Sequence, residues 1–235
     1  MILRHPVFLI AATFVRSQWL VITIMAAYLL GISGIFAMHQ QRTEVAFFLQ
    51  WHSFYVLFLG MMVAIPALQN ERKTRRIIAV LSKGIHRWEY LAGILCGCAF
   101  ISGVLCLLVA EITLWLCRQG SYPTESIPPL VIALFTCCIA ASAVGLFFSI
   151  FLHPLLATIA SSATLLLPWV VEGTGVRPAP LLFPITAIAN TMKEFHFQPV
   201  QGVWSIAVAG VVYAVVFLAA ASAVFNRRDV TTSPE

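Results

Sequence analysis

Long apolar runs alternate with short polar segments along the whole chain. Six of these runs contain roughly 20 residues with few charges, which is the length that an α-helix needs to cross the hydrocarbon layer of a membrane. We place them at about Gln18–Met38, Ala46–Leu68, Glu89–Cys117, Pro128–Phe151, Pro154–Val171 and Val203–Phe225. Only a tight turn at His153-Pro154 separates the fourth run from the fifth. The pattern therefore predicts an all-α polytopic membrane protein, with six transmembrane helices in a single domain over residues 1–235.

The composition agrees with this class. The chain has 235 residues, of which 60% are hydrophobic and 10% are charged, whereas a soluble domain has about 25% charged residues. Its mean hydropathy is +0.94. The net charge of +5 does not call for nucleic acid as a partner, because the positive charges lie in the loops, where they set the orientation of the spans.

The segment before the first run, residues 1–16, has its own periodicity. Leu3, Val7, Ile10 and Phe14 recur at steps of three and four residues. Such spacing is typical of an amphipathic helix that lies on the inner leaflet. A simple extension of the first span would explain the same residues, so both interpretations stay open.

The polar segment between the second and third runs, residues 69–88, is strongly basic. It contains six of the fourteen lysines and arginines of the chain, namely Arg72, Lys73, Arg75, Arg76, Lys83 and Arg87. Lysine and arginine close to a span resist translocation, so we expect this segment in the cytoplasm. An apolar patch at Ile77, Ile78, Val80 and Leu81 favours a surface helix that meets a soluble partner. The alternative is a solvated loop whose charges only fix the orientation.

The distribution of positive charge predicts the orientation of the whole chain. With both termini inside, ten lysines and arginines lie on the inner side and four on the outer side. The outer four are Arg42, Arg118, Arg177 and Lys193. The inverted arrangement would place ten outside, which the positive-inside rule disfavours. We therefore expect a multi-pass protein of the plasma membrane, in bacteria the inner membrane, with both termini cytoplasmic.

Residues of the basic segment and just beyond it follow a known pattern. Glu71, Leu81, Ser82, Arg87, Glu89, Tyr90 and Gly93 stand in the order found after the second span of ABC-2 type permease subunits. Leu182–Asn190 is similar to the proline-containing segment before the last span of that family. The chain thus resembles an ABC-2 type (type V-like) ABC transporter permease. It departs from the pattern at Arg75-Arg76, where the family often has Gly-Thr, at Lys83-Gly84, near the usual proline, and at Ile94, where a lysine is usual.

This resemblance implies the permease subunit of an ATP-driven exporter. The substrate pathway would form in a dimer with a second copy of the chain or a related permease. Residues 172–202 would form an outer re-entrant segment, and a coupling helix in residues 69–88 would contact a separate ABC ATPase. The contact residues implied are Glu71, Arg75, Arg76, Ile77, Ile78, Leu81, Ser82 and Arg87. The chain itself has no P-loop sequence, so we expect ATP and magnesium in the partner ATPase and no cofactor here.

Two groups of side chains inside the predicted spans invite a functional interpretation. Trp51, Phe54, Tyr55 and Phe58 recur at helical steps and would either line a substrate path or face the lipid and the membrane interface. His52 and Glu111 are polar at similar depths. A carboxylate within a span usually faces the protein interior, so we expect Glu111 to bond to His52, Ser53 or Gln50, or to face the pathway. Otherwise the third span ends earlier, and Glu111 reaches the outer interface.

Other functions fit fewer features. A haem- or cofactor-export permease of the cytochrome-maturation type is the alternative within transport, and a structural or signalling membrane subunit remains a third possibility. Gly31-Ile32-Ser33-Gly34 resembles the serine motif of rhomboid intramembrane proteases, but the last span has no histidine to act as its base. The six cysteines lack metal-binding spacing, so no metal site is expected. Ala157 and Ser161 in the fifth span have the small-residue spacing of a helix contact, which predicts a subunit interface there.

The orientation is directly testable. In a chain without its native cysteines, a cysteine at position 73 should react only with reagents on the cytoplasmic side, and one at position 193 only with external reagents. Labelling of position 73 from outside intact cells would reverse the predicted orientation.

Overall fold

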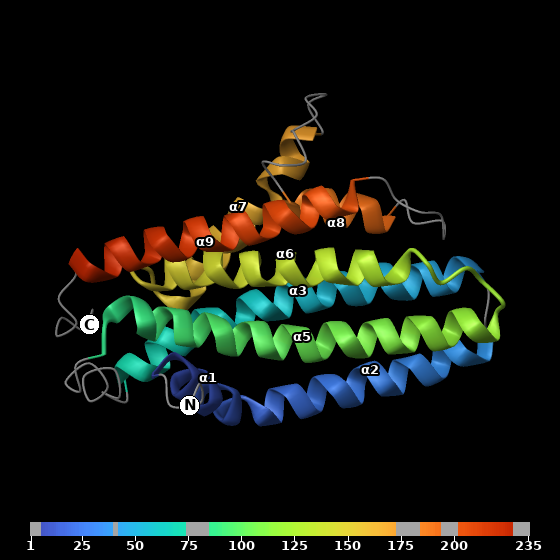
Figure 1. Cartoon of the computed structure of the whole chain (residues 1–235), viewed down its shortest axis with the longest axis horizontal. Helices are drawn as coiled ribbons and strands as arrows, with labels where there is room; N and C mark the ends of the chain where they lie inside the picture. Colours follow the sequence, from blue (N-terminus) through green and yellow to red (C-terminus); the bar gives the residue numbers. More distant parts are fainter. Residues whose placement is uncertain (1–5, 40–41, 74–84, 173–183, 194–201, 228–235) are drawn as a thin grey trace.

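The computed structural model describes residues 6–39, 42–73, 85–172, 184–193 and 202–227. Within these residues the fold is all-helical (Figure 1). The helices are α1 (Pro6–Ser17), α2 (Trp19–His39), α3 (Arg42–Lys73), α5 (Arg87–Gln119), α6 (Ile127–Ser149), α7 (Pro154–Glu172), α8 (Pro184–Lys193) and α9 (Val203–Arg227).

The six predicted runs all fall on helices, α2, α3, α5, α6, α7 and α9. Four helices are long and apolar enough to cross a membrane by themselves: α3 over Val45–Gln69, and α5, α6 and α9 over their whole lengths. The pair α1 and α2 makes a fifth candidate if it is taken as one bent span. The apolar part described for α7, Pro154–Leu166, is shorter than a span. The length and hydropathy of these helices are those of a multi-pass membrane protein.

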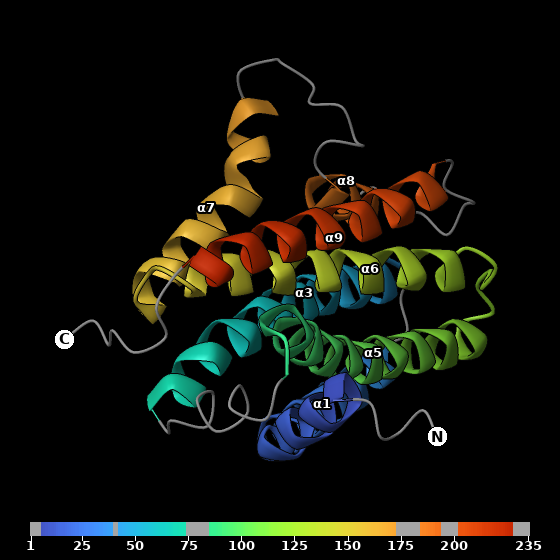
Figure 2. The ribbon, with the colours of Figure 1, turned by 60° about the vertical axis from the view of Figure 1, so that its left-hand side comes forward.

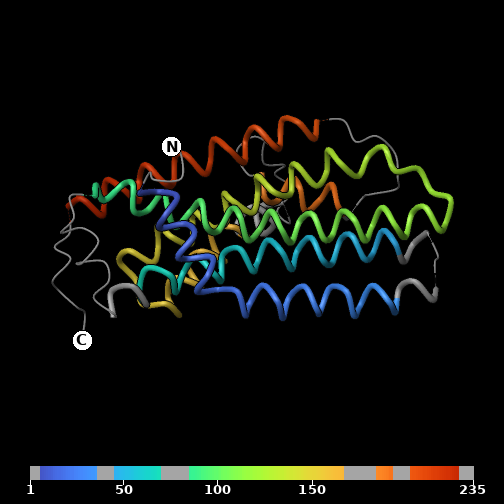
Figure 3. Tube along the Cα trace, turned by 60° about the horizontal axis from the view of Figure 1, so that its bottom comes forward, coloured from blue at the N-terminus to red at the C-terminus, as the bar shows by residue number. Residues whose placement is uncertain are grey.

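The chain bends sharply where the sequence analysis placed the end of its N-terminal segment. α1 and the described part of α2 meet at an angle of 60°, with only Gln18 between them. In Figure 3, α1 crosses the end of the bundle while α2 runs alongside α3. Residues 6–17 therefore form a helix of their own that is bent away from α2. Both interpretations stay open, since the pair can be an interfacial helix followed by a span or one broken span.

α1 packs tightly against the start of α5. A Cβ atom added to Gly93 would lie 2.8 Å from side-chain atoms of Ile10, and one added to Gly97 would lie 2.6 Å from the ring of Phe14. Phe14 is the buried residue of α1. The two glycines thus form a notch that lets the apolar face of α1 approach the backbone of α5.

α6 is the central helix of the bundle and carries a run of small residues in its second half, Ala140–Ala143, with Gly145 just beyond. It packs against α3, α5 and α9, and 78% of its apolar window is buried. Glycines on the neighbouring helices and on α6 itself permit close contact. A Cβ on Gly60 of α3 would lie 3.2 Å from Ser142, and a Cβ on Gly210 of α9 would lie 3.0 Å from the backbone of Thr136. Small residues replace the hydrophobic effect as the means of helix association in a membrane.

Hydroxyl groups inside the bundle are mostly satisfied within their own helices. Ser53 donates to the carbonyl of Leu49 at 2.6 Å, and Thr113 donates to that of Val109, also at 2.6 Å. Ser142 likewise donates to Cys138 at 2.9 Å. These bonds let polar residues occupy a core that contains no water to solvate them.

α7 leaves the bundle after its first turns. It begins close to α6 after a short turn, and its later part points away from the other helices (Figure 2). Ala157 and Ser161 are fully buried within the chain, and Ala157 packs with Met61, Ile65 and Ala141. Ala157 and Ser161 thus pack α7 onto the rest of the chain, whereas Ala160 and Thr164 are only partly buried. The prediction that the fifth span contacts another subunit remains a prediction.

The central packing predicts a clear difference between two glycines. Gly210→Val should destabilise the chain by about 1–3 kcal/mol, because the added atoms would overlap the backbone of Thr136, which cannot move aside. Gly34→Val is the matched control, since nothing lies within 4 Å of a Cβ at Gly34. Thermal unfolding in detergent should show a lower midpoint for the first variant only. Equal midpoints would contradict the close contact of α6 and α9.

Candidate functional site

The end of α3, the start of α5, the end of α9 and the turn between α6 and α7 lie at one end of the bundle, the end predicted to be cytoplasmic (Figure 1). The side chain of Gln69, near the end of α3, donates to the carbonyl of Leu152 in the turn between α6 and α7, at 2.8 Å. Arg87, the first residue of α5, donates to the carbonyl of Phe225 at 2.7 Å and to that of Asn226 at 3.3 Å in the last turn of α9. The ends that flank residues 74–84 are thus both joined to other helices at this inner end.

Arg87 is well suited to this contact. Its guanidinium lies 5.6 Å from the ring centre of Phe225, which is fully buried. A cation at the C-terminal end of a helix is favoured by the helix dipole, and it satisfies carbonyls that have no partner within the helix. The contact role predicted for Arg87 remains a prediction. In this chain, however, part of its hydrogen-bonding capacity is used to hold α9.

Three more residues of the resemblance motif have structural roles close by. Glu89 accepts a hydrogen bond from the backbone N–H of His86 at 3.0 Å and so caps the start of α5. Tyr90 is 1% exposed, and Gly93 admits Ile10 of α1. Together with Arg87, these residues join α1, α5 and α9. We call Arg87, Glu89, Tyr90 and Gly93 the inner corner.

Most of the predicted contact residues cannot be placed. Glu71 lies in the last turn of α3, with its side chain outside the described part. Arg75, Arg76, Ile77, Ile78, Leu81 and Ser82 lie outside the described residues. The predicted coupling helix therefore remains a prediction, of which the structure describes only the two flanking helices.

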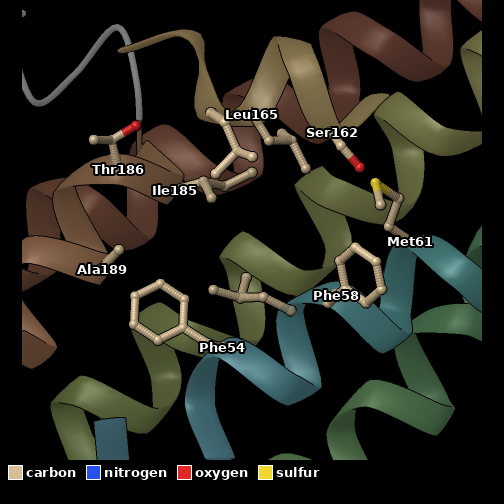
Figure 4. Close-up of a pocket in the computed structure, with 10 residues that line it drawn as sticks. Phe54, Phe58, Met61, Ser162, Leu165, Ile185, Thr186 and Ala189 are labelled. Carbon is tan, nitrogen blue, oxygen red and sulfur yellow. The ribbon is translucent and has the colours of Figure 1, made fainter. Parts of the chain in front are cut away.

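The aromatic residues of α3 divide into two groups. Trp51, Tyr55 and Phe58 are 58%, 45% and 53% exposed on the outside of the bundle. Tyr55 stacks on Tyr28 of α2 at 5.2 Å between ring centres. Phe54 points instead toward α7 and α8 and lines a cleft there (Figure 4). The stripe predicted from the sequence is therefore present. Trp51 and Tyr55 lie on the surface, Phe54 lines the cleft, and Phe58 belongs to both.

This cleft has a volume of about 110 Å³ and three walls. α3 contributes Phe54, Leu57, Phe58 and Met61, α7 contributes Ser162, Leu165 and Leu166, and α8 contributes Ile185, Thr186 and Ala189. Of these, the sequence pattern pointed to Phe54 and Phe58 as possible path residues. Ile185, Thr186 and Ala189 lie in the segment Leu182–Asn190 that carries the resemblance, but their place in the wall depends on where α8 packs.

The two polar residues of the spans lie apart from each other. His52 is 4% exposed, stacks on Phe48 at 4.0 Å and bonds through Nδ1 to its carbonyl at 2.7 Å. Glu111 lies on the exposed face of α5. Within the described part of the chain it bonds to none of His52, Ser53 and Gln50. The predicted pairing of Glu111 is therefore wrong, because the rotation of α5 turns this residue outward.

The exposed tryptophans of α5 explain where Glu111 sits. Trp88 and Trp115 are 52% and 45% exposed, and at 1.5 Å per residue they are about 40 Å apart along the helix. This matches the thickness of a bilayer with its headgroups, where tryptophan gathers at both interfaces. Glu111 lies one turn inside Trp115, close enough for its carboxylate to reach the outer headgroups. That position favours the alternative in which Glu111 belongs to the interface.

Comparisons of the chain with protein-family models, with curated proteins and with solved structures found no match.

The Arg87 contact can be tested by hydrogen exchange. Arg87→Ala should raise the exchange rate of amides in the last turn of α9 by about tenfold, because a hydrogen bond to a charged group contributes roughly 1.5–3 kcal/mol. Arg87→Lys should give an exchange rate between those of the wild type and Arg87→Ala. Lysine keeps the positive charge but lacks the planar guanidinium that donates to two carbonyls. Arg118→Ala, at the opposite end of α5, is the control. Unchanged exchange in both Arg87 variants would refute the contact.

Proposed function

We propose that this chain is the permease subunit of an ATP-driven ABC exporter, which forms its substrate pathway as a dimer and is driven by a separate ATPase. ATP and magnesium belong to that ATPase, because the chain has no P-loop sequence. In bacteria the complex would lie in the inner membrane, with the basic segment and both termini in the cytoplasm.

Two contacts support this proposal most, that of Arg87 in the inner corner and that of Gln69 at the end of α3. The basic segment is joined directly to α3 on one side and to α5 on the other. Gln69 ties the end of α3 to the turn before α7, and Arg87 ties the start of α5 to the end of α9. A soluble partner that displaced the basic segment would thus move the ends of several membrane helices together. Such mechanical connection is what an ATP-driven conformational change requires.

α8 adds support from the other half of the membrane. Cys137, about 15 Å along α6 from its outer end, donates through Sγ to the carbonyl of Pro184 at 3.5 Å. α8 has ten residues, too few to cross a bilayer, and it packs against α3, α6, α7 and α9. A short helix starting at mid-depth is what the resemblance implies for residues 172–202. Backbone that ends inside a membrane requires such a covering of protein.

The complete permease would have six spans, with α7 as the fifth. The exposed leucines and isoleucine of α7, Leu155, Leu156, Ile159 and Leu166, would then contact lipid or the second subunit. Alternating access would arise as the helices of the two subunits rearrange around a shared pathway. The exposed aromatic face of α3 is available to line that pathway.

The proposal of an intramembrane protease receives no support from the serine motif. The hydroxyl of Ser33 donates to the carbonyl of Leu30 at 2.7 Å within its own helix. A nucleophilic serine needs a base within hydrogen-bonding distance. In the described part of the chain, Ser33 is bonded to no histidine.

Substitutions in the predicted coupling helix test the proposed function. Leu81→Asp and Ile77→Asp should each abolish binding of the ATPase, because a carboxylate would enter an apolar contact without a partner. The membrane helices should stay folded, as judged by an unchanged elution profile and thermal midpoint. Binding is measured by pull-down, and ATP turnover by phosphate release from the reconstituted complex.

Thr124→Asp adds the same charge to the loop between α5 and α6 on the opposite side and should leave binding and turnover unchanged. Normal binding and turnover in both Leu81→Asp and Ile77→Asp would show that the segment does not couple the two subunits.

A further inference from the structure

The cleft between α3, α7 and α8 has the chemistry of a hydrocarbon site. Eight of its ten lining residues are apolar, the other two are Ser162 and Thr186, and none carries a charge. An ionic or strongly polar ligand would lose its hydration there without gaining a partner, at a cost of several kcal/mol (roughly 2–7 per unsatisfied polar group). The walls therefore favour a purely apolar group.

The depth of the cleft decides which apolar group can reach it. Pro184 lies beside Cys137, near the middle of α6, and Ile185 and Thr186 of the cleft wall follow directly. Phe54 and Met61 lie well within the apolar part of α3, Val45–Gln69. At this depth the surrounding medium consists of lipid acyl chains.

The cleft is open to that medium on one side and closed on the other. Phe58 and Leu166 are 53% and 49% exposed, whereas Met61, Thr186 and Ala189 are at most 5% exposed. The exposed residues form a rim and the buried ones form the inner part of the walls. Figure 4 shows Phe58 and Met61 on one side of the cleft and Thr186 and Ala189 on the other. A chain in the bilayer can thus enter from the side, between α3 and α7.

The volume limits what fits. A cleft of about 110 Å³ is smaller than the roughly 300–1,000 Å³ of sites that enclose a whole small molecule. It is close to the roughly 150 Å³ apolar cavity that stays dry and holds a benzene molecule. It therefore has room for a segment of one hydrocarbon chain, while the rest of the molecule stays in the bilayer.

We propose that this cleft is a specific binding site for one acyl chain of a membrane phospholipid. The bound chain fills the space beside α8 that the described side chains leave open. It packs on Phe54 and Leu165 from the two long walls and on Ala189 of α8. The site differs from ordinary lipid-facing surface, such as the exposed valines of α9 at Val208, Val211, Val212, Val215 and Val216, because it encloses the chain on three sides.

The test uses the full chain in phosphatidylcholine nanodiscs that contain a phosphatidylcholine with a diazirine in the middle of one acyl chain. After illumination, labelled peptides are identified by mass spectrometry at increasing fractions of the probe. The probe competes with unlabelled phosphatidylcholine of the same headgroup, so labelling of both the cleft and the valine face of α9 should follow the probe fraction. The cleft is distinguished by the loss of its labelling when a side chain fills it.

Two substitutions fill the cleft from different walls. Ala189→Phe acts from α8 and Ser162→Phe from α7, and each should lower labelling of the cleft by about fivefold or more, since the space for the chain is occupied. Val212→Phe, on the exposed face of α9, is the matched control and should leave cleft labelling unchanged. Should one filling variant not fold, as judged by its elution profile, the other gives the same comparison from the opposite wall.

Labelling of the cleft that a folded filling variant leaves unchanged would overturn the site. Labelling by lauric acid bearing the same diazirine, without labelling by the phospholipid, would also overturn it, because the occupant would then be a free single-chain amphiphile. The measurement needs no ATPase. Its failure therefore leaves the proposed function standing, and loss of ATPase coupling leaves this site standing.

Discussion

The close approach of α6 to its neighbours is the contact on which the rest of the fold depends. Lipid offers helices no hydrophobic reason to associate, so dispersion between closely packed backbones has to supply the attraction. Gly60, Gly145 and Gly210 each lie where a larger residue would meet an atom of a neighbouring helix. The same need explains why α6 carries small residues, Cys137, Cys138 and Ala140–Ala143, in the part where its neighbours approach, and why these residues are buried.

This tight centre has consequences at the edges of the molecule. α3, α5 and α9 fill the space around α6, so α7 keeps contact through its first turns and then turns away. α8 is packed beside α3 and α6 but is only ten residues long. The cleft lies between α7 and α8, the two helices that are packed against the bundle over only part of their surface. A firm core with a less completely packed margin is an arrangement in which helices can move against a fixed frame.

Helix positions followed from the sequence because they depend on local composition. Runs of apolar residues, the break at Arg16–Gln18 and the proline after His153 are all local signals, and each has its counterpart in the structure. The rotation of a helix about its own axis is not local. Glu111 was expected to face inward but is exposed, since the stripe of α5 that turns inward is set by the neighbours it meets.

The candidate sites depend still more on distant contacts. Arg87 was recognised from its place in the motif, but its bonds to Phe225 and Asn226 join residues far apart in the chain. No sequence pattern near Arg87 predicts these two hydrogen bonds. The cleft brings together three segments, and Ile185 and Ala189 gain a role there only through the packing of α8 on α3. The basic segment was different, because its charge and its apolar patch are both visible in the sequence itself.

The central claim is that this chain works with a separate ATPase, and one measurement tests it most directly. The tagged chain is purified from its native membrane in mild detergent, and the proteins that remain bound are identified and quantified. The account predicts a P-loop ATPase present in a one-to-one ratio with the chain and ATP hydrolysis by the purified complex. A chain that purifies alone in folded form, or with partners that lack an ATP site, would contradict it.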